Sequence, residues 1–71
     1  MPIVFAPFNT ELTIIKILAD ETLKKHLESL GIVVNQKIEV LSNASGALIC
    51  LIKDSRVALD RNLSTKILVR C

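Results

Sequence analysis

The sequence is poor in the residue types on which most enzymes and nucleic-acid-binding proteins depend. Its 71 residues include one histidine, two cysteines and two phenylalanines, with no tryptophan and no tyrosine. The formal net charge is only +2, too small for the electrostatic footprint of a nucleic-acid-binding protein. Bases would also find almost no aromatic side chains on which to stack. We therefore expect no nucleic acid among the partners of this protein.

No stretch of the sequence is long and apolar enough to cross a membrane. The longest apolar runs, residues 30–34 and 47–52, are far shorter than the ~20 residues that a spanning helix needs. The first residues are apolar but include two prolines and no basic residue, so we expect no signal peptide. A cytoplasmic protein with no direct membrane insertion is the expected result. Cys50 and Cys71 fit that compartment as free thiols, although the sequence alone leaves a disulfide between them open.

The few reactive residues do not form a catalytic or metal-binding pattern. Ser29 follows the only histidine, His26, by three residues, but no strained turn or oxyanion loop accompanies the pair. The two glycines are isolated, which excludes a phosphate-binding loop. His26, Cys50 and Cys71 lack the close spacing of metal ligands. We predict no enzymatic activity, no cofactor and no metal site. His26 reads as a boundary residue on a surface helix, with a metal ligand or pH-sensitive contact as the alternative.

Aliphatic residues dominate the composition. Hydrophobic residues make up 51% of the chain and the mean hydropathy is +0.51. A chain of this length forms a single domain, residues 1–71, and buries only about 60% of its unfolded surface. The chain therefore has more aliphatic side chains than its core can bury. This excess of aliphatic residues predicts a homo-oligomer or an apolar patch reserved for a partner. The candidates are residues 3–5 and the face of Ile49 and Leu51; the alternative is that a small domain simply exposes aliphatic side chains.

One helix, within residues 20–32, has both ends specified by the sequence, and the rest of the chain is organised around it. Asp20 is suited to cap the first turn with its carboxylate, and Glu21 adds negative charge at the positive end of the helix dipole. Gly31 can adopt the positive φ of a Schellman ending, which would bring Ile32 back onto the helix. The apolar stripe consists of Leu23, Leu27 and Leu30. A helix this short is marginal in isolation, so it must pack on strands.

The other segments read as short strands. We predict strands at 12–18, 37–42, 47–53, 56–59 and 66–70. In the first strand, Ile15 and Ile17 are expected on one face, with Leu12 and Ile14 on the other. Alternation places Ile38, Val40, Ile67 and Val69 of the second and last strands inward. Residues 43–46 are expected to form a loop in which Gly46 suits positive φ. Residues 1–9 are predicted to be an extended lead-in, because Pro2 and Pro7 disfavour helix.

Smaller features complete the expected architecture. Phe8 is expected to plug one end of the core, and residues 60–64 to form one irregular or 3₁₀ turn. Tight turns between successive strands favour an antiparallel meander. The predicted fold is mainly β with one short helix. It is a small, strongly bent barrel of five to six antiparallel strands, with the helix covering an open end.

The order and spacing of several short motifs resemble those of the FeoA family. The motifs are Ile14-x-x-Ile17, Leu27-x-x-Leu30-Gly31-Ile32, Ile38-x-Val40, Val57-Ala58-Leu59 and Ile67-x-Val69. The sequence departs from the family pattern at His26, where arginine is usual. It also lacks a glycine near Asn35 and has Asp60 where a basic residue is usual.

The resemblance implies an SH3-like barrel and a non-catalytic accessory role in bacterial ferrous iron uptake. The implied partner is the FeoB membrane permease, which carries a GTP-binding domain and is approached from its cytoplasmic side. Residues 53–71, with five basic and two acidic side chains, could meet an acidic partner or the anionic face of a membrane, with a merely solvated surface as the alternative. Partner contacts are expected at His26, Leu30, Gly31, Ile32, Arg56 and Arg61. The alternative is a metal- or effector-sensing domain like those at the C-terminus of metal-dependent repressors, which would predict a DNA-binding domain on the same chain.

Overall fold

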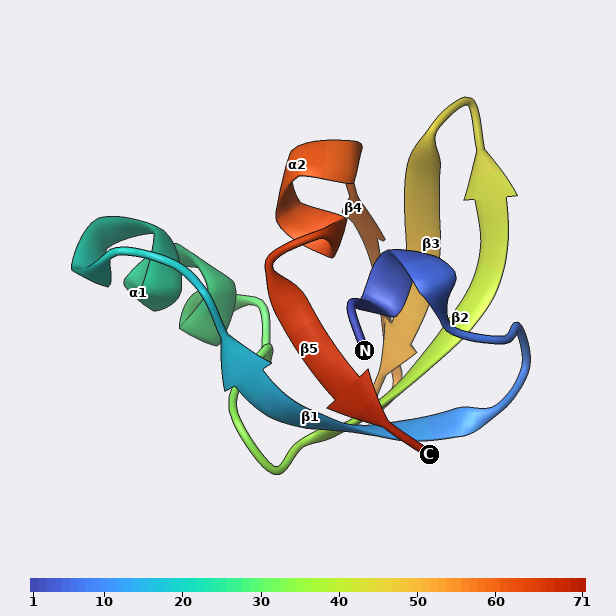
Figure 1. Cartoon of the computed structure of the whole chain (residues 1–71), viewed down its shortest axis with the longest axis horizontal. Coiled ribbons are helices and arrows are strands. Elements are labelled where there is room, and N and C mark those ends of the chain that lie inside the picture. Colours follow the sequence, from blue (N-terminus) through green and yellow to red (C-terminus); the bar gives the residue numbers. More distant parts are fainter.

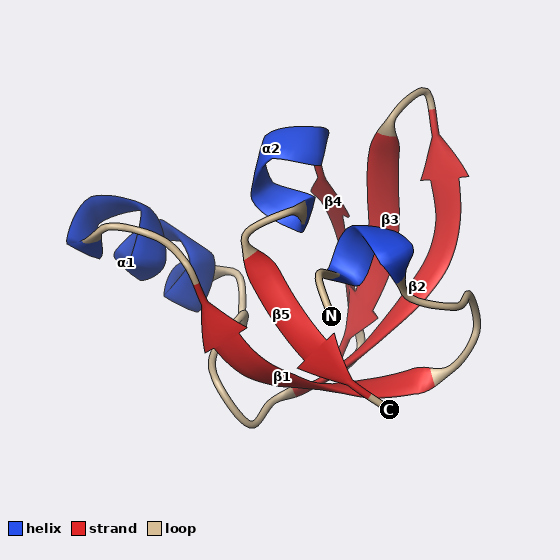
Figure 2. Ribbon diagram, in the orientation of Figure 1, coloured by secondary structure: helices blue, strands red, loops and turns tan.

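Five antiparallel strands form one curled sheet in the computed structural model, which describes all of residues 1–71 (Figures 1 and 2). The sheet order is β4-β3-β2-β1-β5. The strands are β1 (Glu11–Ile17), β2 (Lys37–Ala44), β3 (Ala47–Ile52), β4 (Ser55–Leu59) and β5 (Ile67–Arg70). Successive strands are hydrogen-bonded neighbours from β1 to β4, and β5 returns to the free side of β1. The predicted mainly-β antiparallel fold is confirmed.

The first strand contains a β-bulge that the sequence pattern did not reveal. The pairing of β1 with β5 shifts between Ile14 and Lys16. An extra residue in one strand breaks the two-residue alternation. As a result Leu12, Ile14 and Ile17 are all buried, whereas Ile15 is exposed. The prediction that Ile15 and Ile17 share a face was therefore wrong.

The helix α1 (Glu21–Ser29) has the ends that the sequence predicts. The Leu23 amide donates to the Asp20 carboxylate at 2.8 Å. At the other end, the Gly31 amide donates to the Glu28 carbonyl at 2.9 Å, and the Ile32 amide to the Leu27 carbonyl at 2.9 Å. With Gly31 at φ +91°, these two bonds form a Schellman motif. Leu27 is fully buried, and Leu23 and Leu30 pack against the core.

A second short helix, and not α1, lies over the inside of the curled sheet. The helix α2 (Arg61–Ser64) contacts β3 and β4, whereas α1 extends beyond the end of β1 (Figure 1). The long helix packs on the core through Leu27, Leu23 and Leu30, and α2 covers a different part of it. Asp60 explains why residues 60–64 become helical, because its carboxylate accepts from the Leu63 amide at 2.8 Å and caps the first turn.

The N-terminal segment also differs from the expected extended lead-in. Ile3–Phe5 form a 3₁₀ helix, η1, with the Phe5 amide donating to the Pro2 carbonyl at 3.0 Å. The two prolines flank this turn without entering it, so they do not prevent it. Burial of Ile3, which is fully enclosed, stabilises the turn on the core. Phe8 does not plug the core, since half of it remains exposed.

The interior is almost entirely aliphatic. The core consists of Ile3, Ala6, Leu12, Ile14, Ile17, Leu27, Ile32, Ile38, Val40, Leu48, Cys50, Ile52, Leu59, Ile67 and Val69. These side chains come from η1, α1, the strands and the loops between them, so the core forms only when the sheet has curled. Cys50 and Cys71 are free thiols, the first buried and the second exposed.

Substitution of Gly31 tests the helix ending. A Cβ at this position would lie 3.3 Å from Cγ2 of Ile52, and positive φ costs a residue with a Cβ roughly 1–2 kcal/mol. Gly46, at φ +87° with nothing within 4 Å, is the matched control. We expect Gly31→Ala to lower the melting temperature more than Gly46→Ala, where 1 kcal/mol corresponds to ~4–8 °C. Equal effects in thermal unfolding would contradict the close contact with Ile52.

The buried thiol gives a prediction for alkaline pH. Burial raises the pKa of Cys50 from 9.0 to about 11. Between these values the unfolded chain loses the proton while the folded chain keeps it, so stability falls as pH rises. The free energy of unfolding is measured in urea from pH 8 to 11 for the parent and for Cys50→Val. We expect it to fall more steeply in the parent, by up to about 1.4 kcal/mol per pH unit beyond the fall seen in the variant. Parallel curves for the two proteins would contradict this assignment.

Candidate interaction surface

The structure brings together no catalytic or metal-binding cluster. No group of three or more histidine, cysteine, aspartate or glutamate side chains lies close enough to hold a metal ion. Every buried polar side-chain atom has a hydrogen-bond partner, so no buried polar side chain is left unpaired. The helices of this fold are also too short or too polar to pass through a bilayer. Its surface is therefore where a function must be sought.

Four exposed aliphatic residues lie on the second half of β1, just after it, and on the loop that precedes β2. Ile15, Leu18, Val33 and Val34 are 43%, 47%, 37% and 45% exposed. Two backbone bonds hold the loop of Val33 and Val34 against β1: the Asn35 amide donates to the Ile14 carbonyl at 2.7 Å, and the Ile14 amide to the Gln36 carbonyl at 3.0 Å. We call these four residues the β1 patch.

Local structure explains why these aliphatic side chains face solvent. The β-bulge turns Ile15 outward, and the Schellman ending of α1 sends the chain back from Ile32 along β1. Both devices are rigid backbone features, so the β1 patch is held in place before any partner arrives. Sequence reasoning missed the patch because alternation placed Ile15 on a face with Ile17.

Basic residues lie on the segments that carry the β1 patch and on the strands beside them. Lys16 follows Ile15 in the chain and is exposed, and the Leu18 amide donates to the Lys66 carbonyl at 2.8 Å. Lys37 and Arg70 lie on either side of Thr13 in neighbouring strands. The Lys37 Nζ donates to the Thr13 hydroxyl at 3.0 Å, which fixes that charge over β1. An acidic segment with apolar side chains would be complementary to this surface.

A shallow pocket of about 210 Å³ continues the surface along the sheet. It is lined by Glu11, Gln36, Lys37, Ile38, Glu39, Leu51 and Lys53. Glu11 and Glu39 are directly opposite one another on β1 and β2, an arrangement that is unfavourable unless nearby lysines offset the repulsion. The mixed charge of this pocket suits a peptide carrying both signs better than a small apolar ligand.

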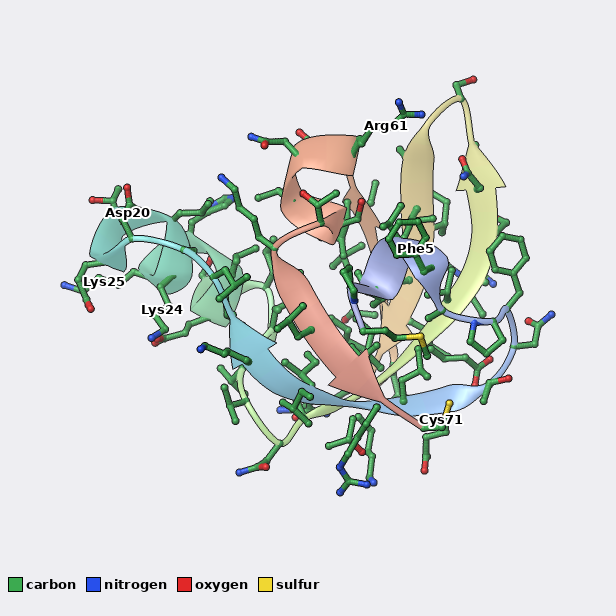
Figure 3. All side chains as sticks on the ribbon, in the orientation of Figure 1. Phe5, Asp20, Lys24, Lys25, Arg61 and Cys71 are labelled. Atoms are coloured by element: carbon green, nitrogen blue, oxygen red, sulfur yellow. The ribbon has the colours of Figure 1, made fainter.

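The residues predicted to contact a partner fall into two groups. His26, Leu30, Gly31 and Ile32 belong to the end of α1, whereas Arg56 and Arg61 belong to β4 and α2. His26, Arg56 and Arg61 are exposed and Leu30 is half-buried. Ile32 is fully buried, so it can act on a partner only by positioning the loop that follows. Figure 3 shows Arg61 on α2, well separated from Lys24 and Lys25 on α1. Only the helix-end group adjoins the β1 patch.

The fold defines a small, mainly β domain of five antiparallel strands with short helices. The entire chain, residues 1–71, matches the FeoA domain family. The chain belongs to the FeoA family, that of Fe(2+) transport protein A, a non-catalytic transport accessory protein with an SH3-like fold.

A relative agrees with this assignment, and solved structures share the fold. The chain is 35% identical over 68 residues to Fe(2+) transport protein A of Methanocaldococcus jannaschii, covering 96% of this chain and 83% of that protein. An iron uptake regulatory protein, FeoA, superposes with a TM-score of 0.87 at 23% identity, covering 97% and 92% of the two chains. Stenotrophomonas maltophilia FeoA complexed with zinc, described as a procaryotic SH3 domain protein, gives 0.83 at 17%, covering 99% and 89%.

The scattered ligating residues predict that folding is independent of metal. His26, Cys50 and Cys71 come from α1, β3 and the C-terminus, and Cys50 is enclosed by the core. We expect purified protein to hold less than one equivalent of iron or zinc, and a chelator to leave the melting temperature unchanged. Elemental analysis and thermal unfolding with and without EDTA measure both quantities. One equivalent of metal, lost together with the fold on chelation, would contradict this.

Proposed function

We propose that this protein works in the cytoplasm as an accessory protein of ferrous iron uptake, where it binds the FeoB permease and regulates it. Membership of the FeoA family supports the pathway. The observation that carries the binding role is the β1 patch with its basic border, on a domain that has no cluster of catalytic or metal-ligating residues.

The geometry of the patch suits a helix or loop of a larger protein. Ile15 and Leu18 come from the end of β1 and the residue after it, and Val33 and Val34 from the loop that is hydrogen-bonded to β1, so all four expose apolar area on neighbouring segments. Burying such area provides the affinity, about 25 cal/mol per Å² before the costs of association. The lysines near the patch would raise the rate of association with an acidic surface of the partner and would orient that surface on the patch. The end of α1 contributes by fixing the loop.

The binding test compares parent and variants against the cytoplasmic GTP-binding domain of the permease. Ile15→Glu and Val34→Glu place a charge in the β1 patch, while their exposed positions leave the core intact. We expect each change to weaken binding in calorimetry by at least tenfold, about 1.4 kcal/mol, with an unchanged melting temperature. Added salt should also weaken parental binding, because the basic border is screened.

Phe5→Glu is the matched control, because Phe5 is 75% exposed on η1, away from α1 (Figure 3). Its binding should equal that of the parent. Wild-type affinity of both patch variants would show that the partner binds elsewhere. Failure of the parent to bind the domain, or to change its rate of GTP hydrolysis, would contradict the proposed function itself.

A further inference from the structure

One edge of the sheet is hydrogen-bonded to another segment of the chain, and the other edge is open. The outer edge of β5 is paired with the N-terminus: the Val69 amide donates to the Met1 carbonyl at 2.8 Å, and the Met1 amino group to the Val69 carbonyl at 2.9 Å. The outer edge of β4 has no such cover, since β4 ends the sheet and pairs only with β3. Open strand edges are templates for pairing with another chain, and proteins usually block them.

The hairpin between β3 and β4 determines which backbone groups are open. Ile52 pairs with Ser55 across a two-residue turn, so this pair, and then every second pair, exchanges hydrogen bonds between β3 and β4. The amides and carbonyls of Arg56 and Ala58 must then face away from β3. We call these groups the β4 edge. Both residues are exposed, and no proline or lysine in β4 blocks the edge.

We propose that the β4 edge pairs antiparallel with the β4 edge of a second copy of this chain, with Ala58 opposite Ala58. In this register Arg56 of each copy lies opposite Asp60 of the other, so two ion pairs form around the symmetry axis. Asp60 continues the extended backbone, at φ −71° and ψ 173°. Its Oδ1 caps α2 and its second carboxylate oxygen is available to the arginine.

Charge selects this register over its neighbours. A pairing centred on Arg56 would place the two arginines opposite each other. A pairing centred on Val57 would place Asp54 of each copy opposite Asp60 of the other, which gives two pairs of like charges. Both alternatives set like charges across the strands, which is destabilising. Ala58, at the axis of the favoured register, has the smallest side chain in β4, so two strands can approach closely. The strand is short, so the dimer is expected to be weak and reversible.

Sedimentation velocity over a range of protein concentrations tests the dimer, together with amide exchange at Arg56 and Ala58. We expect the sedimentation coefficient and the protection of these two amides to rise together with concentration. Arg56→Glu should keep the protein monomeric, because glutamate would face Asp60. Lys25→Glu makes the same charge change on α1 and should dimerise as the parent does (Figure 3). Asp60→Asn, which retains a capping side chain, should weaken the dimer without unfolding α2.

Three results would overturn the proposal. The first is a monomer at every concentration. The second is a dimer that Arg56→Glu leaves intact, which would place the interface elsewhere. The third is protection of Arg56 and Ala58 only after the permease domain is added, which would make the β4 edge a site for that protein. Melting temperatures of the variants show whether a lost dimer reflects a lost fold.

Discussion

The β-bulge in β1 is the constraint on which the rest of this structure depends. β1 lies between β2 and β5, so it joins the meander of the first four strands to the last strand of the chain. A bulge bends its strand and increases the local twist, which helps one continuous sheet to curl around a core. The same extra residue moves Ile17 inward and Ile15 outward. One local irregularity therefore supplies both a core side chain and part of the β1 patch.

The two ends of the chain also help to close the curled sheet. β5 pairs with β1, and Met1 in turn pairs with Val69, so the first and last segments of the chain cover one edge of the sheet. Between the curled halves, α2 and η1 fill the space with side chains such as Ile3. The buried core is almost entirely aliphatic, and the one pocket of the structure is the shallow one on the sheet surface. Binding surfaces are confined to the outside, where rigid backbone holds them.

The candidate site was only partly predictable from sequence. The predicted excess of aliphatic residues does appear on the surface, but only partly where it was expected: in residues 3–5, Ile3 is fully buried whereas Phe5 is exposed, and Ile49 and Leu51 are half-buried. Among the predicted contact residues, those at the end of α1 adjoin the β1 patch. Arg56 and Arg61 lie on other elements. Which apolar side chains face solvent depends on how strands pair, and composition carries no information about pairing.

The sequence by itself determined the features whose causes are local. Asp20 and Gly31 define the ends of α1 through hydrogen bonds that span three to five residues, and Ser45 and Gly46, both at positive φ, form the tight turn between β2 and β3. Alternation placed Ile38, Val40, Ile67 and Val69 in the core correctly. Only the tertiary structure decided the bulge, the 3₁₀ turn of Ile3 and the open edge of β4. Each of these depends on contacts between segments far apart in the chain, whose energies no local pattern contains.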